Sequence, residues 1–356
     1  MSKRVLVTGG LGFIGSCFVR RIMRNTPDMD VYVVDALSYA GNINNLPEST
    51  WHDPRFFFWK GDVRDKQVVD RLVSKVDAVV HFAAETHVDN SIYNTDDFVD
   101  TDVKGTQNLL DAIRRHPVER FIHISTSEVY GTALTAPMTE DHPLNPRSPY
   151  AGAKCGADRL VYSYVSTFNL PAVILRPFNN YGPHQHVEKV IPCFVTHALR
   201  NQPLPMHGDG SSSRDWLFVE DCCAAVEQAL TVDSKAICGE VINLGTGTET
   251  DVATIAEQVL TSLRKPRSLL AQIAERPGQV FRHIGSTAKA KDLLGWTAQT
   301  AFADGLRRTV QWYVDNESWW RTNTHKAGGA WQPREAPEKV LTPAVQAAMA
   351  RSFATL

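Results

Sequence analysis

The sequence predicts an α/β fold, in which a doubly wound parallel sheet is followed by a smaller, mainly helical C-terminal lobe. Short β-rich runs alternate with amphipathic stretches as far as about residue 177. Alternation at this spacing is typical of a parallel sheet with helices on both faces. After Pro177 two turn-rich segments precede a region dominated by helices. With 356 residues the chain has room for two lobes, since single cores tend to divide beyond about 250–300 residues.

The elements are expected in the following order. Strands in the first part are predicted at 5–8, 31–35, 55–60, 78–82, 120–125 and 172–176, and helices at 16–24, 66–75, 99–115 and 151–169. In the smaller lobe, helices are predicted at 191–201, 219–230, 251–263 and 300–316, with one strand at 240–244. We therefore expect a nucleotide-binding unit over 1–178, a substrate lobe over 179–321 and a loosely attached tail over 322–356.

A glycine-rich turn follows the first strand, with Gly9, Gly12 and Gly15 spaced as Gly-x-x-Gly-x-x-Gly. A Cβ there would keep the backbone away from a pyrophosphate, and the following helix N-terminus offers N–H groups to that anion. The second strand ends at Asp35, where a carboxylate accepts hydrogen bonds from a ribose diol. Because an acid there would repel a 2′-phosphate, the pattern predicts a Rossmann site that takes NAD rather than NADP.

Composition excludes several other classes of function. The net charge of −2 gives no footprint for nucleic acid or an anionic membrane. No apolar run approaches the roughly 18–20 residues of a membrane span, and the N-terminus opens into the first strand without a signal peptide. The six cysteines lack metal spacing, and His184, His186 and Glu188 lie in a Pro-flanked loop, so we discount a metal. A reduced, cytoplasmic protein is expected.

Two further motifs carry polar chemistry. Tyr150 and Lys154 are spaced to share one face of a helix. A cationic lysine there would lower the pKa of the phenol, giving a base for a sugar hydroxyl; the alternative is a surface i,i+4 pair. Thr126-Ser127-Glu128 follows the strand at 120–125, and strand carboxyl ends face the ligand crevice of such a sheet. The alternative for this tripeptide is a simple strand-to-loop turn.

Together these motifs resemble an extended short-chain dehydrogenase/reductase, and within that group the nucleotide-sugar 4,6-dehydratases typified by dTDP-glucose 4,6-dehydratase. The resemblance covers roughly residues 3–300, including the stretches at 35–42, 81–92, 179–183, 188–189, 214–216 and 276–278. It implies that NAD is bound by Gly9, Gly12, Phe13, Ile14, Gly15, Asp35, Asp62, Val63, Ala83, Ala84, Tyr150 and Lys154. It also implies contacts to a nucleotide-diphosphate sugar from Glu85, His87, Asn179, Asn180, Glu188, Lys189, Arg214 and Arg276.

The resemblance also implies catalytic roles. Tyr150, with Lys154 and Thr126, would take the proton of the C4 hydroxyl, and Glu128 would take the C5 proton. The relatives carry Thr-Asp-Glu, in which the Asp protonates the departing C6 hydroxyl; here Ser127 stands in its place, and a serine has no carboxyl proton to give. Capping or packing is the alternative for Glu85 and His87, and a surface ion pair with Asp215 is the alternative for Arg214.

Dehydration is the leading hypothesis, and others stay open. Thr-Ser-Glu occurs in GDP-mannose 4,6-dehydratases, and it also resembles the tripeptide of UDP-glucuronate decarboxylases, in which carbon dioxide leaves without an acid. A C4-epimerase and a non-catalytic NAD-binding module are further alternatives. Relatives of this kind are commonly dimers that pack two helices from each subunit, which predicts a homodimer through 99–115 and 151–169.

Overall fold

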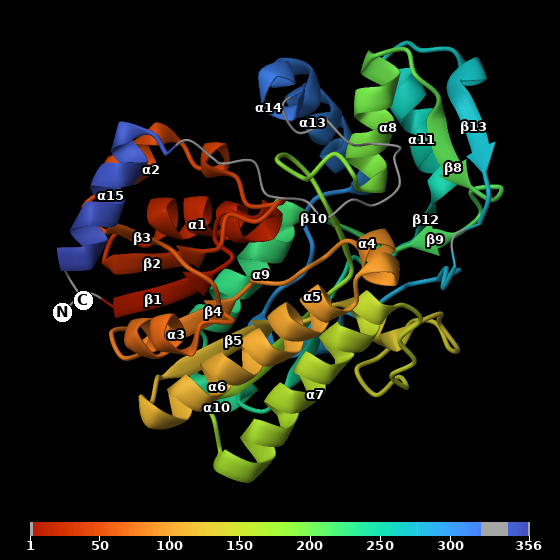
Figure 1. Ribbon diagram of the computed structural model, residues 1–356. Helices are drawn as coiled ribbons and strands as arrows, with labels where there is room; N and C mark the ends of the chain where they lie inside the picture. Colours follow the sequence, from red (N-terminus) through yellow and green to blue (C-terminus); the bar gives the residue numbers. More distant parts are fainter. Residues whose placement is uncertain (1–2, 276, 322–340, 355–356) are drawn as a thin grey trace.

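A seven-stranded sheet forms the centre of the molecule (Figure 1). The computed structural model describes residues 3–275, 277–321 and 341–354. All neighbouring strands of this sheet run parallel, in the spatial order β11-β6-β5-β4-β1-β2-β3. They are β1 (Lys3–Thr8), β2 (Met29–Asp35), β3 (Phe56–Lys60), β4 (Ala78–His81), β5 (Arg120–Ile124), β6 (Ala172–Pro177) and β11 (Val241–Leu244). The strand order reverses between β1 and β4, where such sheets bind their ligands.

Both faces of the sheet are apolar because successive strand residues point to opposite sides. In β1, Val5 and Val7 are buried under one helical layer and Leu6 under the other. The first layer consists of α1 (Phe13–Asn25), α9 (Val219–Thr231), α12 (Ala288–Leu294) and α15 (Pro343–Ala354). The second consists of α3 (Lys66–Val73), α6 (Gly105–Arg115) and α7 (Pro149–Phe168). The predicted fold class is confirmed.

Short elements connect these layers. They are η1 (Ile43–Asn45), α2 (Glu48–His52), α4 (Val88–Tyr93), α5 (Asp96–Phe98), the π-helical η2 (Val99–Lys104), η3 (Ser127–Tyr130) and α10 (Ser234–Ile237). The helix expected over 99–115 is therefore a π-helical segment that continues into α6. A π-helical turn inside a longer helix is frequent at functional sites.

The smaller lobe has its own apolar core, which contains Phe194, Ile255 and Val310. Its helices are α8 (Val190–Leu199), α11 (Val252–Ser262), α13 (Phe302–Asp315) and α14 (Glu317–Arg321), with the short η4 (Arg267–Leu269). Sequence analysis missed its strand pairs, which are β7 (Asn179–Tyr181) with β10 (Trp216–Phe218), β9 (Ser213–Arg214) with β12 (Thr250–Asp251), and β8 (Leu204–His207) with β13 (Leu270–Ile273). Each strand has at most four residues, so alternation of polarity gives little signal.

The chain returns to the large sheet after it has entered the smaller lobe. β11 pairs with β6 at the sheet edge, and α9 packs against α1. The expectation that 219–230 and 240–244 belong to the substrate lobe is therefore wrong, and residue 178 is no single boundary. The physical reason is that Ile242 and Leu244 extend the apolar face that Leu175 already presents.

Part of the expected loose tail is also firmly packed. Helix α15 lies against β3 and α2 (Figure 1), with Val345 and Ala348 buried. The Phe58 amide on this edge strand donates to Ser352 Oγ at 2.7 Å. The expectation of a loosely attached tail is wrong for 341–354, while 322–340 lie outside the described residues. Within the described ranges no helix is long and apolar enough to cross a membrane.

Candidate active site

A cleft of about 350 Å³ opens at the carboxyl ends of β1, β4, β5 and β6. Its walls come from both lobes, as expected for a ligand bound at the switch point of the sheet. The structure brings together in it these predicted residues: Gly9, Gly12, Phe13, Ile14, Gly15, Asp35, Asp62, Val63, Ala83, Ala84, Glu85, Thr126, Ser127, Glu128, Tyr150, Lys154, Asn179, Asn180, Glu188 and Lys189.

The glycine turn leaves its backbone open toward the cleft. Gly9 has a φ of +67°, and a Cβ there would lie 2.6 Å from the Ala83 nitrogen. A Cβ on Gly15 would overlap the Gly9 carbonyl oxygen. Only glycine fits such positions, and the 13 residues of α1 begin directly after Gly12. The turn therefore aims the helix N-terminus at the cleft, where a pyrophosphate would bind.

Asp35 ends β2 at the far wall of the cleft and is buried. Its Oδ2 accepts the Leu11 amide at 2.9 Å, and its Oδ1 accepts the Leu37 amide at 2.8 Å. A carboxylate has further lone pairs to accept hydroxyl donors. Asp62 lies nearby, and its carboxylate forms an ion pair with the Arg64 guanidinium at 2.7 Å. The glycine turn can bind a diphosphate and Asp35 can accept a ribose diol. Together with the apolar walls of the cleft, these features fit NAD.

The start of α7 places Tyr150 and Lys154 on the face that lines the cleft. Ser148 caps this helix by accepting the Ala151 amide at 3.1 Å, and Pro149 occupies its first turn. Lys154 Nζ donates to the Ile124 carbonyl at 2.8 Å and is buried. Both side chains are thus fixed against the end of β5, and the surface-pair alternative is excluded.

The acidity of Tyr150 differs from the expectation. Burial raises the pKa of its phenol well above the ordinary value, and the charges of Asp102 and Glu128 add to this increase, while a hydrogen bond with Thr126 opposes it. The expected lowering by Lys154 is not seen. Lys154 Nζ donates a hydrogen bond to the backbone carbonyl of Ile124, and burial lowers the pKa of its ammonium group.

The tripeptide after β5 forms the turn η3, in which Thr126 Oγ1 accepts the Glu128 amide at 3.2 Å. Glu128 lines the cleft and is partly exposed, and Ser127 also lines the cleft although it is buried. The turn therefore brings the hydroxyls of Thr126 and Ser127 and the carboxylate of Glu128 to one wall of the cleft, where they face Tyr150.

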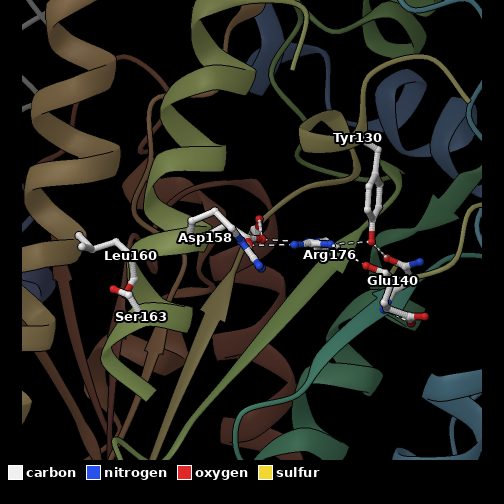
Figure 2. A network of polar contacts seen from close by, with 9 residues as sticks. Tyr130, Glu140, Asp158, Leu160, Ser163 and Arg176 are labelled. Atoms are coloured by element: carbon white, nitrogen blue, oxygen red, sulfur yellow. Dashed lines mark hydrogen bonds and ion pairs between the residues drawn. The ribbon is translucent and has the colours of Figure 1, made fainter. Parts of the chain in front are cut away.

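A buried ion pair beneath this turn fixes it from both ends. Figure 2 shows Arg176 between Asp158 and Tyr130, with two hydrogen bonds of 2.9 Å to the carboxylate and one of 2.8 Å to the phenol. Ser125 Oγ donates to Asp158 at 2.7 Å, and Tyr130 donates to Asn243 at 2.7 Å. Burial opposes ionisation of Asp158, but the hydrogen bonds and charge of Arg176 outweigh it and lower that pKa.

Two carboxyl groups with raised pKa values lie at the opposite wall: Glu85, which is partly buried and lines the cleft, and Asp102, which is buried behind it. The amide of Glu85 donates to Asp102 Oδ1 at 2.8 Å. Burial, followed by the charge of Asp102, raises the pKa of Glu85 to about 8. Burial raises the pKa of Asp102 to about 7, although Lys154 opposes this increase. Glu85, the one of the two that lines the cleft, is therefore largely neutral near pH 7, and a neutral carboxyl group can donate to a sugar hydroxyl as well as accept from it.

Glu188 and Lys189 link the lobes across the cleft. Tyr39 Oη donates to Glu188 Oε1 at 3.0 Å, and Lys189 Nζ donates to the Thr86 carbonyl at 2.6 Å. Burial opposes the charge of Glu188, but the hydrogen bond with His186 and the charges of His186, Lys189 and His87 together outweigh it and lower the pKa of Glu188. These contacts hold the cleft walls at a fixed separation.

Among the described residues, two of the predicted ones, His87 and Arg214, do not line the cleft. His87 caps α4 by accepting the Asn90 amide, as its packing alternative predicts. Arg214 is buried on β9, where its guanidinium donates to the Val280 carbonyl at 2.5 Å. The surface-pair alternative for Arg214 is wrong, since Asp215 is itself fully buried and accepts backbone amides. Arg276 lies outside the described residues.

Sequence reasoning missed Trp319 on α14, which also lines the cleft. Its indole Nε1 donates to Asn45 Oδ1 at 3.1 Å, across 274 positions of the chain. Ring contacts join it to His184 at 5.8 Å between centroids. The pair of tryptophans at the end of the smaller lobe was the only available signal, and no spacing rule connects it to the glycine turn.

Comparison with known proteins agrees with this geometry. The family model described as GDP-mannose 4,6 dehydratase matches residues 6–309. A dTDP-glucose 4,6-dehydratase of Streptomyces niveus is 44% identical over 322 residues, covering 89% of this chain and 94% of the relative. The low-salt glycan biosynthesis protein Agl12 of Haloferax volcanii is also 44% identical, over 313 residues, covering 88% of this chain and 99% of that protein.

Solved structures show the same likeness. The dTDP-glucose 4,6-dehydratase DesIV of Streptomyces venezuelae, with NAD and TYD bound, has a TM-score of 0.87 at 42% identity and covers 90% of this chain and 99% of its own. The UDP-glucuronic acid 4-epimerase of Bacillus cereus, with UDP-glucuronic acid and NAD, has a TM-score of 0.83 at 29% identity, with coverage of 88% and 99%. The motifs, the cleft and these matches agree, and the chain belongs to the GDP-mannose 4,6 dehydratase family.

Proposed function

We propose that the protein is an NAD-dependent nucleotide-sugar 4,6-dehydratase. The observation that carries this proposal is that a tyrosine–lysine pair and a separate carboxylate, Glu128, face one cleft that also contains the glycine turn. The pair serves oxidation at C4, which all relatives of this kind share. A second base at C5 distinguishes an elimination from a simple oxidation.

The cofactor assignment rests on the cleft and on the neighbours. Relatives of similar fold were crystallised with NAD, and Asp35 occupies the position that a 2′-phosphate would need. NAD supplies a hydride acceptor for C4 and later the hydride for C6. Because the cofactor is restored within each turnover, its release would gain nothing, and we expect the protein to purify with NAD bound.

The protein side chains handle the protons. Tyr150, hydrogen-bonded with Thr126, takes the proton of the C4 hydroxyl. Because burial raises the pKa of this phenol, the proposal requires positive charge near it, from Lys154 and from a bound nicotinamide, to favour the phenolate. The resulting 4-keto group acidifies the C5 proton, which Glu128 removes. Water then leaves from C6, and Glu128 returns a proton to C5 when the hydride reaches C6. Positioned acid–base groups of this type contribute about 10²–10⁴-fold each.

UDP-glucuronate decarboxylation is the second candidate, because Ser127 replaces the carboxylic acid that the resembling dehydratases use. A decarboxylase needs neither an acid at C6 nor proton removal at C5. Incubation of the purified protein with dTDP-glucose, GDP-mannose and UDP-glucuronate separates the candidates by mass. We expect loss of water from a hexose substrate; loss of carbon dioxide from UDP-glucuronate without any loss of water would overturn the proposal.

A Glu128→Gln variant sharpens the comparison. In a dehydratase it should stop the reaction after oxidation at C4, because the C5 proton stays in place. In a decarboxylase, carbon dioxide release should continue. Rapid quenching and mass analysis of the sugar distinguish the two outcomes.

The homodimer remains a prediction. The two helical stretches expected at the interface lie side by side as α6 and α7, and exposed Tyr162 and Phe168 on α7 give that surface an apolar character. Light scattering on the purified protein measures the assembly directly.

A further inference from the structure

Ser127 has a partner that sequence analysis did not identify. Its Oγ lies 3.4 Å from Nδ1 of His283, which is 156 positions further along the chain. His283 is fully buried, and Ser127 is 2% exposed. Ser127 reaches the cleft wall while His283 does not, so any effect of the imidazole on a substrate passes through the serine hydroxyl.

The segment that carries His283 is fixed on both sides. The His283 amide donates to the Ser213 carbonyl at 3.1 Å, and the Met138 amide donates to the Ile284 carbonyl at 2.8 Å. The Phe178 ring packs edge-on against the imidazole, at 6.0 Å between centroids. The ring is therefore held in one orientation behind η3.

The second ring nitrogen determines the tautomer. Nε2 of His283 lies 2.5 Å from the Gly131 carbonyl oxygen. A carbonyl only accepts hydrogen bonds, so Nε2 carries a hydrogen. In the neutral ring Nδ1 is then an acceptor, and it takes the hydrogen of the Ser127 hydroxyl. In the protonated ring Nδ1 is a donor, and the hydroxyl hydrogen of Ser127 is released toward the cleft.

The charged groups around His283 shift the pKa of its imidazole in opposite directions. Glu128 Oε1 lies 4.0 Å from Nδ1 on the cleft side. Burial lowers the pKa of His283, the Glu128 carboxylate partly offsets this by raising it, and Arg214 and His142 lower it further. This balance favours a neutral ring at rest, and the Glu128 carboxylate stabilises the imidazolium that forms when Nδ1 takes up a proton from solvent before each elimination.

We infer that His283 is a positioning residue through which Ser127 acts as the acid at C6, in place of the missing carboxyl group. The inference rests on the proposed dehydratase function. It explains how elimination proceeds although residue 127 has no acidic proton of its own. The imidazole supplies the proton, and the hydroxyl transfers it across the 3.4 Å gap.

The proton transfers balance over one turnover. Glu128 takes the C5 proton, the C5–H electron pair becomes the C5–C6 double bond, and the C6–O bond breaks with its electrons on oxygen. That oxygen takes the Ser127 Oγ proton, Oγ takes the Nδ1 proton, and water leaves. His283 is then neutral, while Tyr150 holds the proton from the C4 hydroxyl. The proton that Tyr150 then releases to solvent replaces the one that Nδ1 of His283 took up before the elimination, so both residues return to their resting states with no net change in protons.

The test compares two leaving groups in wild type and in His283→Gln. With a dTDP-hexose that carries its C6 hydroxyl, we expect the variant to lose about 10²-fold or more in kcat, as removal of an acid does. With the corresponding 6-deoxy-6-fluoro sugar, fluoride leaves without protonation, so the variant should stay within about threefold of wild type. The wild-type rate of water loss should fall as pH rises, and this fall should disappear in the variant.

Control variants separate this role from a structural one. His197→Gln removes a histidine of the smaller lobe that hydrogen-bonds the Pro203 carbonyl and does not line the cleft, and it should keep both rates. Introducing Ser127→Asp into the His283→Gln protein should restore water loss, because a carboxylic acid then stands at C6. Equal losses for both leaving groups, or an unchanged pH dependence in His283→Gln, would overturn the inference. The dehydratase proposal itself fails only if wild type releases no water from any hexose.

Discussion

Tyr150 is held more rigidly than a hydrogen-bonding pair alone requires. Its ring packs edge-on against Phe98, at 6.2 Å between centroids, and its helix is capped by Ser148. Removing the hydroxyl therefore leaves the packing of the ring unchanged. Replacing Tyr150 by Phe can therefore test the chemical role of the hydroxyl without disturbing the fold.

We predict that Tyr150→Phe abolishes oxidation at C4 while the protein stays folded. Loss of a general base should reduce the rate by about 10²–10⁴-fold, measured as consumption of the nucleotide sugar. Tyr162→Phe on the exposed side of the same helix should keep the wild-type rate. Activity of Tyr150→Phe within about threefold of wild type would exclude this residue from the mechanism.

Glu85 gives a prediction about pH and stability. Its pKa is raised from 4.5 to about 8 in the folded protein, so the folded state binds this proton more tightly than the unfolded state. The free energy of unfolding should therefore fall as pH rises between these two values, by at most about 1.4 kcal/mol per pH unit. Glu85→Gln lacks this loss and should be more stable than wild type above pH 8, with little gain near pH 4.5.

Urea unfolding at both pH values measures the difference. Glu48→Gln alters an exposed carboxyl group and should follow wild type at each pH. If Glu85→Gln and wild type differ equally at both pH values, burial of a charged Glu85 costs no stability and the raised pKa is wrong.

At the scale of elements, β3 is an edge strand that the chain itself covers. Edge strands expose unpaired amides to other chains unless something blocks them. Here α15 lies along the strand, and Ser352 supplies an acceptor for the Phe58 amide. Helix α15 therefore shields the β3 edge of the sheet from pairing with another chain.

We predict that Ser352→Ala lowers the free energy of unfolding by about 1–3 kcal/mol, because it leaves a buried amide without an acceptor. Ser163→Ala is the matched control, since that exposed helical serine only donates to the Leu160 carbonyl. Urea unfolding of the two variants compares the costs. Similar small effects would show that the covering of β3 does not depend on this hydrogen bond.

The elements also show how far sequence reasoning reaches. Strands such as 31–35 and the turn from Gly9 to Gly15 were predictable because local rules of spacing and backbone freedom dictate them. The partner of β11 was not predictable, since Ile242 and Leu244 fit either lobe equally well. The contact of His283 with Ser127 depends on the path of the smaller lobe, and no local pattern records it.

At the scale of the whole molecule, the two lobes are fastened on both sides of the cleft. Trp319 of α14 bonds Asn45 near the glycine turn, and Tyr39 bonds Glu188. Asn45 in turn donates to the Leu11 carbonyl at 2.9 Å. The contact of Trp319 is thereby connected to the glycine turn, in which Leu11 lies. A cofactor in the cleft would have to break such contacts in order to leave.

We therefore predict that Trp319→Phe releases NAD about 2–10-fold faster than wild type, which corresponds to the loss of one hydrogen bond between the lobes. Trp320→Phe is the control, because that indole donates to the Tyr313 carbonyl within the smaller lobe. Exchange of bound NAD against labelled NAD, followed in the absence of substrate, measures both rates. Equal acceleration in the two variants would mean that the smaller lobe has merely loosened, since of these two tryptophans only Trp319 bonds across the cleft. Faster release from Trp319→Phe alone would show that the contact between lobes retains the cofactor between turnovers.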